Sequence, residues 1–323
     1  MSDEIDKHVI RKYDIGPKVG KGAYGIVWKA VDRATGRLVA LKKIFDAFQN
    51  ATDAQRTFRE IMFLQELNAS HHENIIRLLN VLKADNDKDM YLVFEYMEIN
   101  LHSVIRANIL EDVHQRYIMY QVVKAILYMH SGQLLHRDLK PSNVLLNADC
   151  RVKICDLGLA RSVRDITSNA KDAVLTDYVA TRWYRAPEIL LGSGRYNKAV
   201  DVWALGCILA EMLGGRPLFQ GESTLDQLVK ICEVLGKPSE QDILAIRSKF
   251  AASMLETVRP KNFKPIAQLF PNAPADALDL LSKLLVFNPD KRPSCEEILR
   301  HPYLSAFHDP SQEPVLKHSI HIS

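Results

Sequence analysis

One stretch constrains this chain more than any other: His136-Arg137-Asp138-Leu139-Lys140-Pro141-Ser142-Asn143. It follows a long amphipathic pattern and precedes a short apolar run that ends in Asp156-Leu157-Gly158. A carboxylate, a lysine and an asparagine thus lie close together, with a second carboxylate downstream. Such a set can bring a hydroxyl nucleophile, a metal ion and a polyphosphate together. Alone, Asp138 would indicate little, because most carboxylates lie on solvated surfaces.

Composition limits the class of protein. The chain has 323 residues, more than one hydrophobic core usually covers, so we expect two lobes or domains. Its 47% hydrophobic and 25% charged residues are typical of globular proteins. The formal net charge is only +3 and basic residues form no blocks, which gives no reason to expect a nucleic-acid partner. No apolar run reaches the ~18 residues of a membrane span, so we expect no membrane insertion.

Cysteine usage and the start of the chain indicate a compartment. The five cysteines lack the CxxC spacing of zinc and redox motifs, and their odd number favours reduced thiols. The acidic start, Ser2-Asp3-Glu4, is unlike a secretory signal. We therefore expect an intracellular protein, in the cytoplasm and also in the nucleus.

The hydrophobic pattern changes near Met97, from strands with one helix to mostly helices. We therefore divide the chain into residues 1–97, residues 98–305 and a tail at 306–323, which wraps the surface or is disordered. The expected strands lie in Tyr13–Lys43, Leu38–Ile44, Asn74–Ala84 and Met90–Tyr96. The expected helices are Thr52–Leu67, Val113–Met129, Val202–Leu213, which is apolar nearly all round and should be buried, Leu225–Leu235, Ala275–Val286 and Glu296–Leu304.

A glycine-rich stretch, Gly20-Lys21-Gly22-Ala23-Tyr24-Gly25, separates two of the expected strands. A lone GxGxxG pattern is a weak signal, because dinucleotide-binding folds use it too. There it opens a helix, whereas here Ile26, Val27 and Trp28 continue a strand. Glycines let backbone N–H groups approach phosphates closely, because no Cβ intervenes. An ordinary hairpin remains the alternative at this point.

Lys42 follows Val39-Ala40-Leu41 on an expected interior strand. A lysine among apolar neighbours would carry a buried charge, and such a charge needs a partner. Glu60 on the following helix is the natural partner, and the pair could hold two phosphates of a nucleotide. The alternative for Lys42 is a solvated strand residue, which is what we expect of Lys43 beside it.

These motifs occur, together with Ala186-Pro187-Glu188, in the order of the protein-kinase signature set. From Tyr13 to about Tyr303 the chain therefore resembles protein kinases. The resemblance implies a two-lobed α+β fold, with a small antiparallel β-sheet lobe that carries one main helix and a larger, mainly α-helical lobe. It also implies ATP and Mg²⁺ as cofactors.

The resemblance implies that Asp138, Lys140, Lys42 and Glu60 are catalytic and that Asn143 and Asp156 bind metal. Asp138 would accept or orient the proton of a substrate hydroxyl, and Lys140 would neutralise charge on the transferred γ-phosphoryl group. Asn143 and Asp156 would hold Mg²⁺. Phosphoryl transfer needs in-line positioning and cations at the phosphate oxygens more than covalent chemistry.

The nucleotide site is implied in the same way. Lys42, positioned by Glu60, would hold the α- and β-phosphates, and Phe94 would close the back of the adenine pocket. The implied ATP-binding residues are Val19, Gly20, Lys21, Gly22, Ala23, Tyr24, Gly25, Val27, Ala40, Lys42, Phe94, Glu95 and Met97.

The neighbours of Asp156, Leu157 and Cys155, each raise a question of function. Leu157 stands where the family has the Phe of its D-F-G motif, and it is smaller and not planar. Mg²⁺ binding by Asp156 is not threatened by this change, while the stability of the flipped, inactive conformation is left open. Cys155 is either a reactive thiol at the nucleotide site or a small buried hydrophobe, and we favour the second.

Residues 175–188 resemble the activation segment of mitogen-activated protein (MAP) kinases, with Thr176-Asp177-Tyr178 as the phosphorylated pair. Phosphate on Thr176 adds nearly two negative charges and needs a cationic pocket. The residues implied to pair with these phosphates are Arg59, Arg137 and Arg161 for Thr176, and Arg182 and Arg185 for Tyr178.

Cyclin-dependent kinases are the alternative within the wider family. They carry the threonine but usually lack the tyrosine, and usually have an apolar residue in place of Arg182, so Tyr178 with Arg182 favours a MAP kinase. Residues 43–48 and 52–60 resemble the atypical extracellular signal-regulated kinase branch usually numbered seven or eight, the mitogen-activated protein kinase fifteen type. That branch is generally thought to phosphorylate its own Thr-x-Tyr pair and adds the cilium, basal body or cytoskeleton as locations.

The resemblance implies a monomer that acts on proteins with Ser or Thr followed by Pro. The active-site cleft, the insert at about residues 238–274 and the C-terminal region are implied surfaces for docking or regulatory proteins. Asp309 and Glu313 stand in the C-terminal region, but Gln312 replaces an acid that would dock basic motifs.

The resemblance also implies structural contacts for several residues outside the catalytic set. By resemblance, Glu188 and Arg292 would form a buried ion pair, Asp201 would anchor the catalytic loop, and Thr181 would contact Lys140. A catalytically silent scaffold with the kinase fold is the alternative from a different class of protein. The intact set of catalytic residues argues against it.

Overall fold

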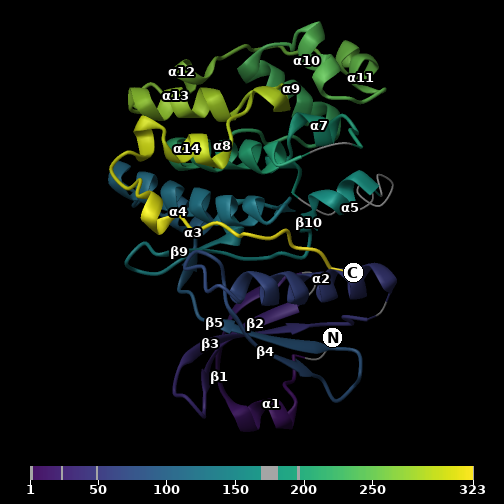
Figure 1. The fold of residues 1–323 in the computed structure, drawn as a ribbon, viewed down its shortest axis with the longest axis vertical. Helices are drawn as coiled ribbons and strands as arrows, with labels where there is room; N and C mark the ends of the chain where they lie inside the picture. Colours follow the sequence, from purple (N-terminus) through teal and green to yellow (C-terminus); the bar gives the residue numbers. More distant parts are fainter. Residues whose placement is uncertain (1–2, 23–24, 49, 169–180, 195–196, 323) are drawn as a thin grey trace.

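The computed structural model describes residues 3–22, 25–48, 50–168, 181–194 and 197–322. Figure 1 shows two lobes, one built around a sheet and one of stacked helices, as the α+β fold class predicts. Within the described residues, no helix combines the length and the apolar character that crossing a membrane requires.

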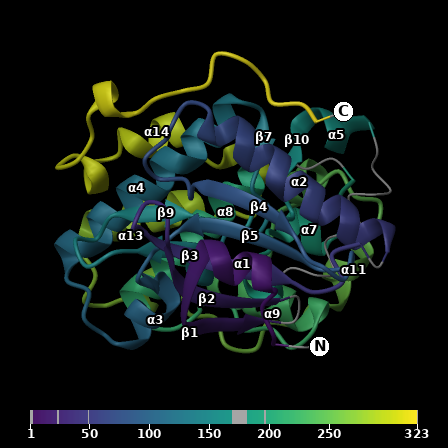
Figure 2. The same cartoon turned by 90° about the horizontal axis from the view of Figure 1, so that it is seen from below.

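The first lobe is a five-stranded antiparallel sheet with the strand order β1-β2-β3-β5-β4. Helix α1 lies on one face of the sheet and α2 on the other, as Figures 1 and 2 show from two directions. Val9 of α1 packs with Leu41 and Tyr91, while Ile61 of α2 packs with Leu92. The elements are α1 Lys7–Lys12, β1 Tyr13–Gly22, β2 Gly25–Asp32, β3 Leu38–Ile44, α2 Ala51–Asn68, β4 Leu78–Lys83 and β5 Met90–Glu95.

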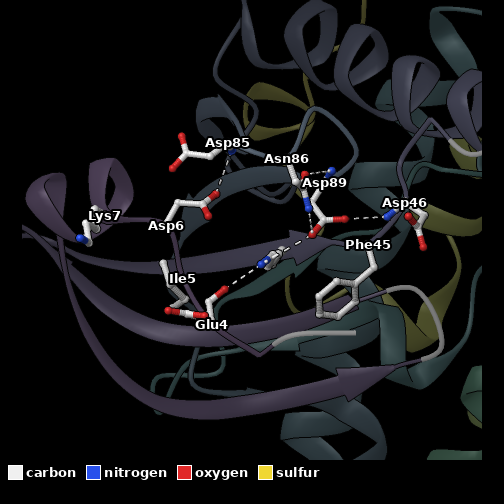
Figure 3. A pocket seen from close by; sticks show the side chains of 10 residues that line it. Glu4, Ile5, Asp6, Lys7, Phe45, Asp46, Asp85, Asn86 and Asp89 are labelled. Atoms are coloured by element: carbon white, nitrogen blue, oxygen red, sulfur yellow. Dashed lines mark hydrogen bonds and ion pairs between the residues drawn. The ribbon is translucent and has the colours of Figure 1, made fainter.

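Strand β3 places its two lysines on opposite faces, because side chains alternate along a strand. Lys42 faces α2, whereas Lys43 pairs with Tyr91 and faces the side of α1. Lys43 is only 4% exposed, so the expectation of a solvated residue is wrong. Its Nζ donates to the carbonyl of Glu4 at 2.7 Å and lies 3.6 Å from Asp89 Oδ2. Figure 3 shows the pocket that Glu4 and Asp89 line.

The second lobe is packed around α4, Asp112–Ser131, and α8, Ala199–Gly214. Every residue of α8 from Val200 to Met212 is buried, as its apolar sequence predicts. The other helices are α3 Leu101–Arg106, α5 Val163–Ser168, α7 Pro187–Leu190, α9 Thr224–Leu235, α10 Glu240–Ala245, α11 Ala251–Thr257, α12 Ile266–Leu269, α13 Ala275–Leu284 and α14 Cys295–Leu299. The short strands are β6 Ile99–Asn100, β7 Leu134–Leu135, β8 Val144–Leu146, β9 Val152–Ile154 and β10 Arg161–Ser162.

The C-terminal tail packs against the molecule up to its last described residues. The amide of Leu316 donates to Ser131 Oγ at 2.8 Å, and the amide of Ile320 donates to the carbonyl of Gly132 at 2.8 Å. Both side chains are buried in the core of the helical lobe. In Figure 1 the yellow tail runs from this lobe to the level of α2. Of the two expected states, the structure shows the wrapped one.

Candidate active site

The carboxylate of Asp201 on α8 binds the backbone of the segment between β7 and β8. Asp201 Oδ1 accepts the amide of Arg137 at 2.9 Å, and Oδ2 accepts the amide of His136 at 3.0 Å. His130 Nε2, from the end of α4, lies 2.8 Å from the same Oδ2. Although burial opposes the charge of Asp201, the hydrogen bond from His130 and the amide of Arg137 hold its pKa below the usual value. The expected anchor is therefore an ionised carboxylate.

Asp138, Lys140 and Asn143 of the predicted site lie together beside this anchor, with Thr181 next to them. Lys140 Nζ lies 3.6 Å from Asp138 Oδ1 and donates to Thr181 Oγ1 at 3.0 Å. Asn143 Nδ2 donates to the carbonyl of Asp138 at 2.8 Å, which closes the turn Pro141–Asn143. Burial raises the pKa of Asp138, so this carboxylate is a stronger base than a solvated one.

Two non-glycine residues of the site have left-handed backbone. Arg137 has a φ of 69° and Asp156 a φ of 63°. Such conformations cost about 1 kcal/mol or more and persist only where the surroundings enforce them. The hydrogen bonds that the backbone amides of His136 and Arg137 donate to Asp201 enforce the first, and the amide of Gly158, which donates to Asp156 Oδ1 at 3.3 Å, supports the second. Backbone strain thus coincides with two residues that the sequence singled out.

Lys42 and Glu60 join the sheet to α2. Lys42 Nζ lies 3.6 Å from Glu60 Oε1, and the Glu60 side chain is almost fully buried. Although burial opposes its charge, the carboxylates of Glu60 and Asp156 raise the pKa of Lys42. Lys42 is therefore an ammonium group with one bound partner and a second carboxylate nearby.

A cavity of about 570 Å³ lies between the glycine-rich hairpin, α2 and the catalytic segment. Its volume falls in the range of small-ligand sites. The predicted residues that line it are Gly20, Lys21, Gly22, Gly25, Val27, Lys42, Glu60, Asn143 and Asp156. Val19, Ala40, Phe94, Glu95 and Met97 are not part of its lining, and Ala23 and Tyr24 lie outside the described residues.

Sheet register explains where the predicted adenine residues lie. Val27 pairs directly with Lys42, and Ala40 pairs with Phe94. Directly paired residues, and residues two apart on a strand, share a face of the sheet. Val27, Ala40 and Phe94 therefore share the face of Lys42. Glu95 is engaged elsewhere, because its Oε1 accepts the amide of Arg77 at 2.8 Å and lies 3.0 Å from Lys153 Nζ.

Arg56 is a site residue that the sequence reading missed. It lines the same cavity from α2, and its Nη2 lies 3.8 Å from Asp156 Oδ1. A Cβ at Gly158 would lie 2.6 Å from Arg56 Nε, so the guanidinium rests directly on this backbone. Although burial opposes the charge of Asp156, Lys42 and Arg56 hold its pKa below the usual value. In the sequence, nothing distinguishes an arginine one helical turn before Glu60 from an arginine that points into solvent.

The residues on either side of Asp156, Cys155 and Leu157, pack against the hydrophobic core. Cys155 is half-buried against the core, and burial raises the pKa of its thiol, which favours the interpretation of a packed hydrophobe over that of a reactive thiol. Leu157 is 1% exposed and belongs to the same core cluster as Leu64. The carbonyl of Cys155 is contacted by His136 Nε2 at 3.0 Å.

The five arginines predicted to bind phosphate come from separate parts of the chain. The pairing of β7 with β10 places Arg161 opposite Leu135, next to the segment that carries Arg137. Arg59 is half-buried on α2. Arg185 lines a small cavity together with Arg137, while Arg182 Nη1 donates to the carbonyl of Glu222 at 3.3 Å. Thr176 and Tyr178 lie outside the described residues.

The predicted buried ion pair between Glu188 and Arg292 is present in the helical lobe. Arg292 donates to both carboxylate oxygens of Glu188, at 2.7 and 2.8 Å, and both side chains are almost completely buried. The guanidinium also donates to three backbone carbonyls in the same lobe, those of Ala199, Val286 and Phe287. A buried charge pair of this kind is stable only with such complete hydrogen bonding.

Comparison with known proteins identifies the family. Residues 13–304 match the protein kinase domain. Extracellular signal-regulated kinase 2 of Dictyostelium discoideum is 62% identical over 323 residues, which cover 100% of this chain and 87% of that protein. Mitogen-activated protein kinase 15 of Xenopus laevis is 58% identical over 319 residues, and that of Caenorhabditis elegans is 54% identical over 325 residues. These matches cover 98% and 99% of this chain, and 54% and 69% of the relatives.

This chain belongs to the mitogen-activated protein kinase family. Its domain is that of a serine/threonine protein kinase, with ATP as a substrate and proteins as phosphate acceptors. In this kinase, Lys42, Glu60, Asn143 and Asp156 line one cavity together with the glycine-rich hairpin. The chain spans about half the length of the Xenopus relative.

The contact between Arg56 and Asp156 leads to a prediction about metal affinity. In the variant Arg56→Ala, Mg²⁺ no longer competes with a cation at Asp156, and we expect its apparent affinity to rise about two- to fivefold, as suits a partly exposed ion pair. The measurement is a Mg²⁺ titration of kinase activity at fixed ATP. Arg33→Ala, which breaks an exposed pair with Asp14 at 3.2 Å, is the matched control and should change nothing. Unchanged or weaker Mg²⁺ affinity in Arg56→Ala would contradict the prediction.

Proposed function

We propose that this kinase phosphorylates Ser or Thr followed by Pro, and that it becomes active when it phosphorylates its own Thr176 and Tyr178. The observation that carries the catalytic part is one cavity onto which Lys42, Asn143 and Asp156 converge. Asp138, whose backbone carbonyl is bound by Asn143, follows directly on the segment that Asp201 anchors.

The donor set of the cavity fits a magnesium ion. Asn143 and Asp156 both line it and offer the hard oxygen ligands that Mg²⁺ prefers. The ionised state of Asp156 supports this assignment, because a metal ligand must be deprotonated. When bound, Mg²⁺ would neutralise charge on the phosphates of ATP.

The protein's own groups perform the remaining work. Lys42, held by Glu60, binds phosphate oxygens, and Lys140 offers a second cation beside Asp138. Asp138 orients the substrate hydroxyl and takes its proton, a role that its buried environment favours. Because Lys140 is fixed to Thr181, the position of the segment after residue 180 is coupled to the catalytic carboxylate.

Docking of basic motifs at the C-terminal region is proposed to be weak. Glu313 contacts His308 Nδ1 at 2.7 Å and Tyr120 Oη at 3.2 Å, and its side chain is only 7% exposed. Asp309 Oδ1 accepts both the amide and the hydroxyl of Ser311, at 2.9 and 2.7 Å. Both acids thus form hydrogen bonds within the chain, which makes them less available to a basic partner. In addition, Gln312 stands where a further acid is expected.

One assay tests both the substrate choice and the role of Asp138. It uses two peptides that differ only in the residue after the phosphorylated Ser, which is Pro in one and Ala in the other. We expect transfer to the Ser-Pro peptide to be much faster, and Asp138→Ala to lower kcat by about 10²–10⁴-fold, as for loss of a catalytic base. Asp149→Ala, which removes an exposed carboxylate eleven residues further along the chain, is the matched control. Equal rates on both peptides would refute the Pro preference, and a wild-type kcat in Asp138→Ala would refute the role of the base.

Self-phosphorylation is tested by intact-mass analysis of protein made in bacteria and incubated with Mg²⁺ and ATP. We expect two added phosphates, at Thr176 and Tyr178, and none in Asp156→Ala, because that variant lacks the metal ligand. Protein with Asp156→Ala that still acquires both phosphates would show that another kinase adds them.

A further inference from the structure

A row of buried polar groups lies behind the catalytic segment and ends in a cysteine. Cys295 Sγ lies 3.7 Å from His130 Nδ1, and His130 Nε2 lies 2.8 Å from Asp201 Oδ2. Cys295 opens α14, His130 lies near the end of α4 and Asp201 near the start of α8, so three helices meet here. All three side chains are buried, with exposed fractions of 2%, 5% and 0%.

Proton positions in this row follow from the chemistry of its two ends. Asp201 is a carboxylate and can only accept, so His130 Nε2 must carry a proton. In a neutral imidazole the other nitrogen, Nδ1, is then an acceptor. Burial raises the pKa of Cys295 well above the ordinary thiol value, so its sulfur carries a proton and can donate to Nδ1.

We propose that Cys295 is a positioning residue for phosphoryl transfer: its S–H fixes the tautomer of His130 that donates to Asp201, and Asp201 in turn holds the catalytic segment. This inference rests on the catalytic role proposed for Asp138. Asp201 Oδ2 serves His130 and the amide of His136 at once, and Oδ1 serves the amide of Arg137. The opposite tautomer of His130 would turn a lone pair toward this carboxylate and loosen both amides.

The competing interpretation is that Cys295 only fills space. A buried cysteine commonly behaves as a small hydrophobe, and Cys232 of α9 is an internal reference for that behaviour. It is 0% exposed, and no histidine nitrogen contacts its sulfur among the described residues. Replacing either cysteine with alanine removes the same atoms, but only one replacement removes a donor to His130.

The kinetic test compares Cys295→Ala, Cys295→Ser and Cys232→Ala in the full chain with Mg²⁺, ATP and the Ser-Pro peptide. We expect Cys295→Ala to lower kcat about three- to tenfold, which corresponds to one neutral buried hydrogen bond, while KM for ATP stays close to wild type. Cys295→Ser keeps an O–H donor and should recover most of kcat. Cys232→Ala should match the wild type. Equal losses in both alanine variants, or no loss in Cys295→Ala, would overturn the proposal.

An infrared measurement tests the hydrogen bond without reference to activity. The S–H stretching band that vanishes in Cys295→Ser should lie at lower frequency than the band that vanishes in Cys232→Ala, because donation to nitrogen weakens the S–H bond. Bands at the same frequency would refute the donor role. If the wild type transfers no phosphate, the proposed function fails, while this spectrum still decides the contact. If the wild type is active and the bands coincide, only the present inference fails.

Discussion

The carboxylate of Asp201 is the interaction on which the rest of the active site depends. It lies on the most buried helix of the molecule and accepts hydrogen bonds from His130 and from the amides of His136 and Arg137. Removing a partner from a buried charge costs about 3–5 kcal/mol, so these contacts form as a set. The left-handed backbone of Arg137 persists because this set enforces it. The position of Asp138, the next residue, is therefore determined by the core of the helical lobe.

Lys42, Glu60 and Arg56 of the first lobe and Asp156 of the second form a group of charges beside the cavity. The cation of Lys42 contacts Glu60 on α2, and Arg56 of the same helix contacts Asp156 from the other lobe. Helix α2 thus carries one anion that binds Lys42 and one cation that reaches Asp156, the proposed metal ligand. The pair of Lys42 and Glu60 is largely buried, whereas the pair of Arg56 and Asp156 is partly exposed, so the second pair contributes only modestly to stability.

Sequence reasoning located the fold class, the catalytic segment and the ion pair of Glu188 with Arg292, because each depends on local pattern or on linked motifs. It missed features that depend on contacts between distant segments. Lys43 was expected in solvent, but the N-terminal segment covers it. Arg56 and Cys295 gave no signal, since an arginine on a helix and a cysteine in an amphipathic segment are usually structural. The strand register, which sorts Lys42 from Lys43, was available only in the folded chain.

The variant Asp201→Asn tests this account most directly, because it keeps the size of the side chain and replaces one acceptor with an amide donor. The new NH₂ group would face His130 Nε2–H or a backbone amide, so the catalytic segment should move while the cavity that binds ATP stays intact. The measurement is kcat for the Ser-Pro peptide beside the Kd of a non-hydrolysable ATP analogue. The account predicts a loss of about 10²-fold or more in kcat, as for a small displacement of a catalytic group, with nearly unchanged Kd. Wild-type kcat in a folded Asp201→Asn protein would contradict it.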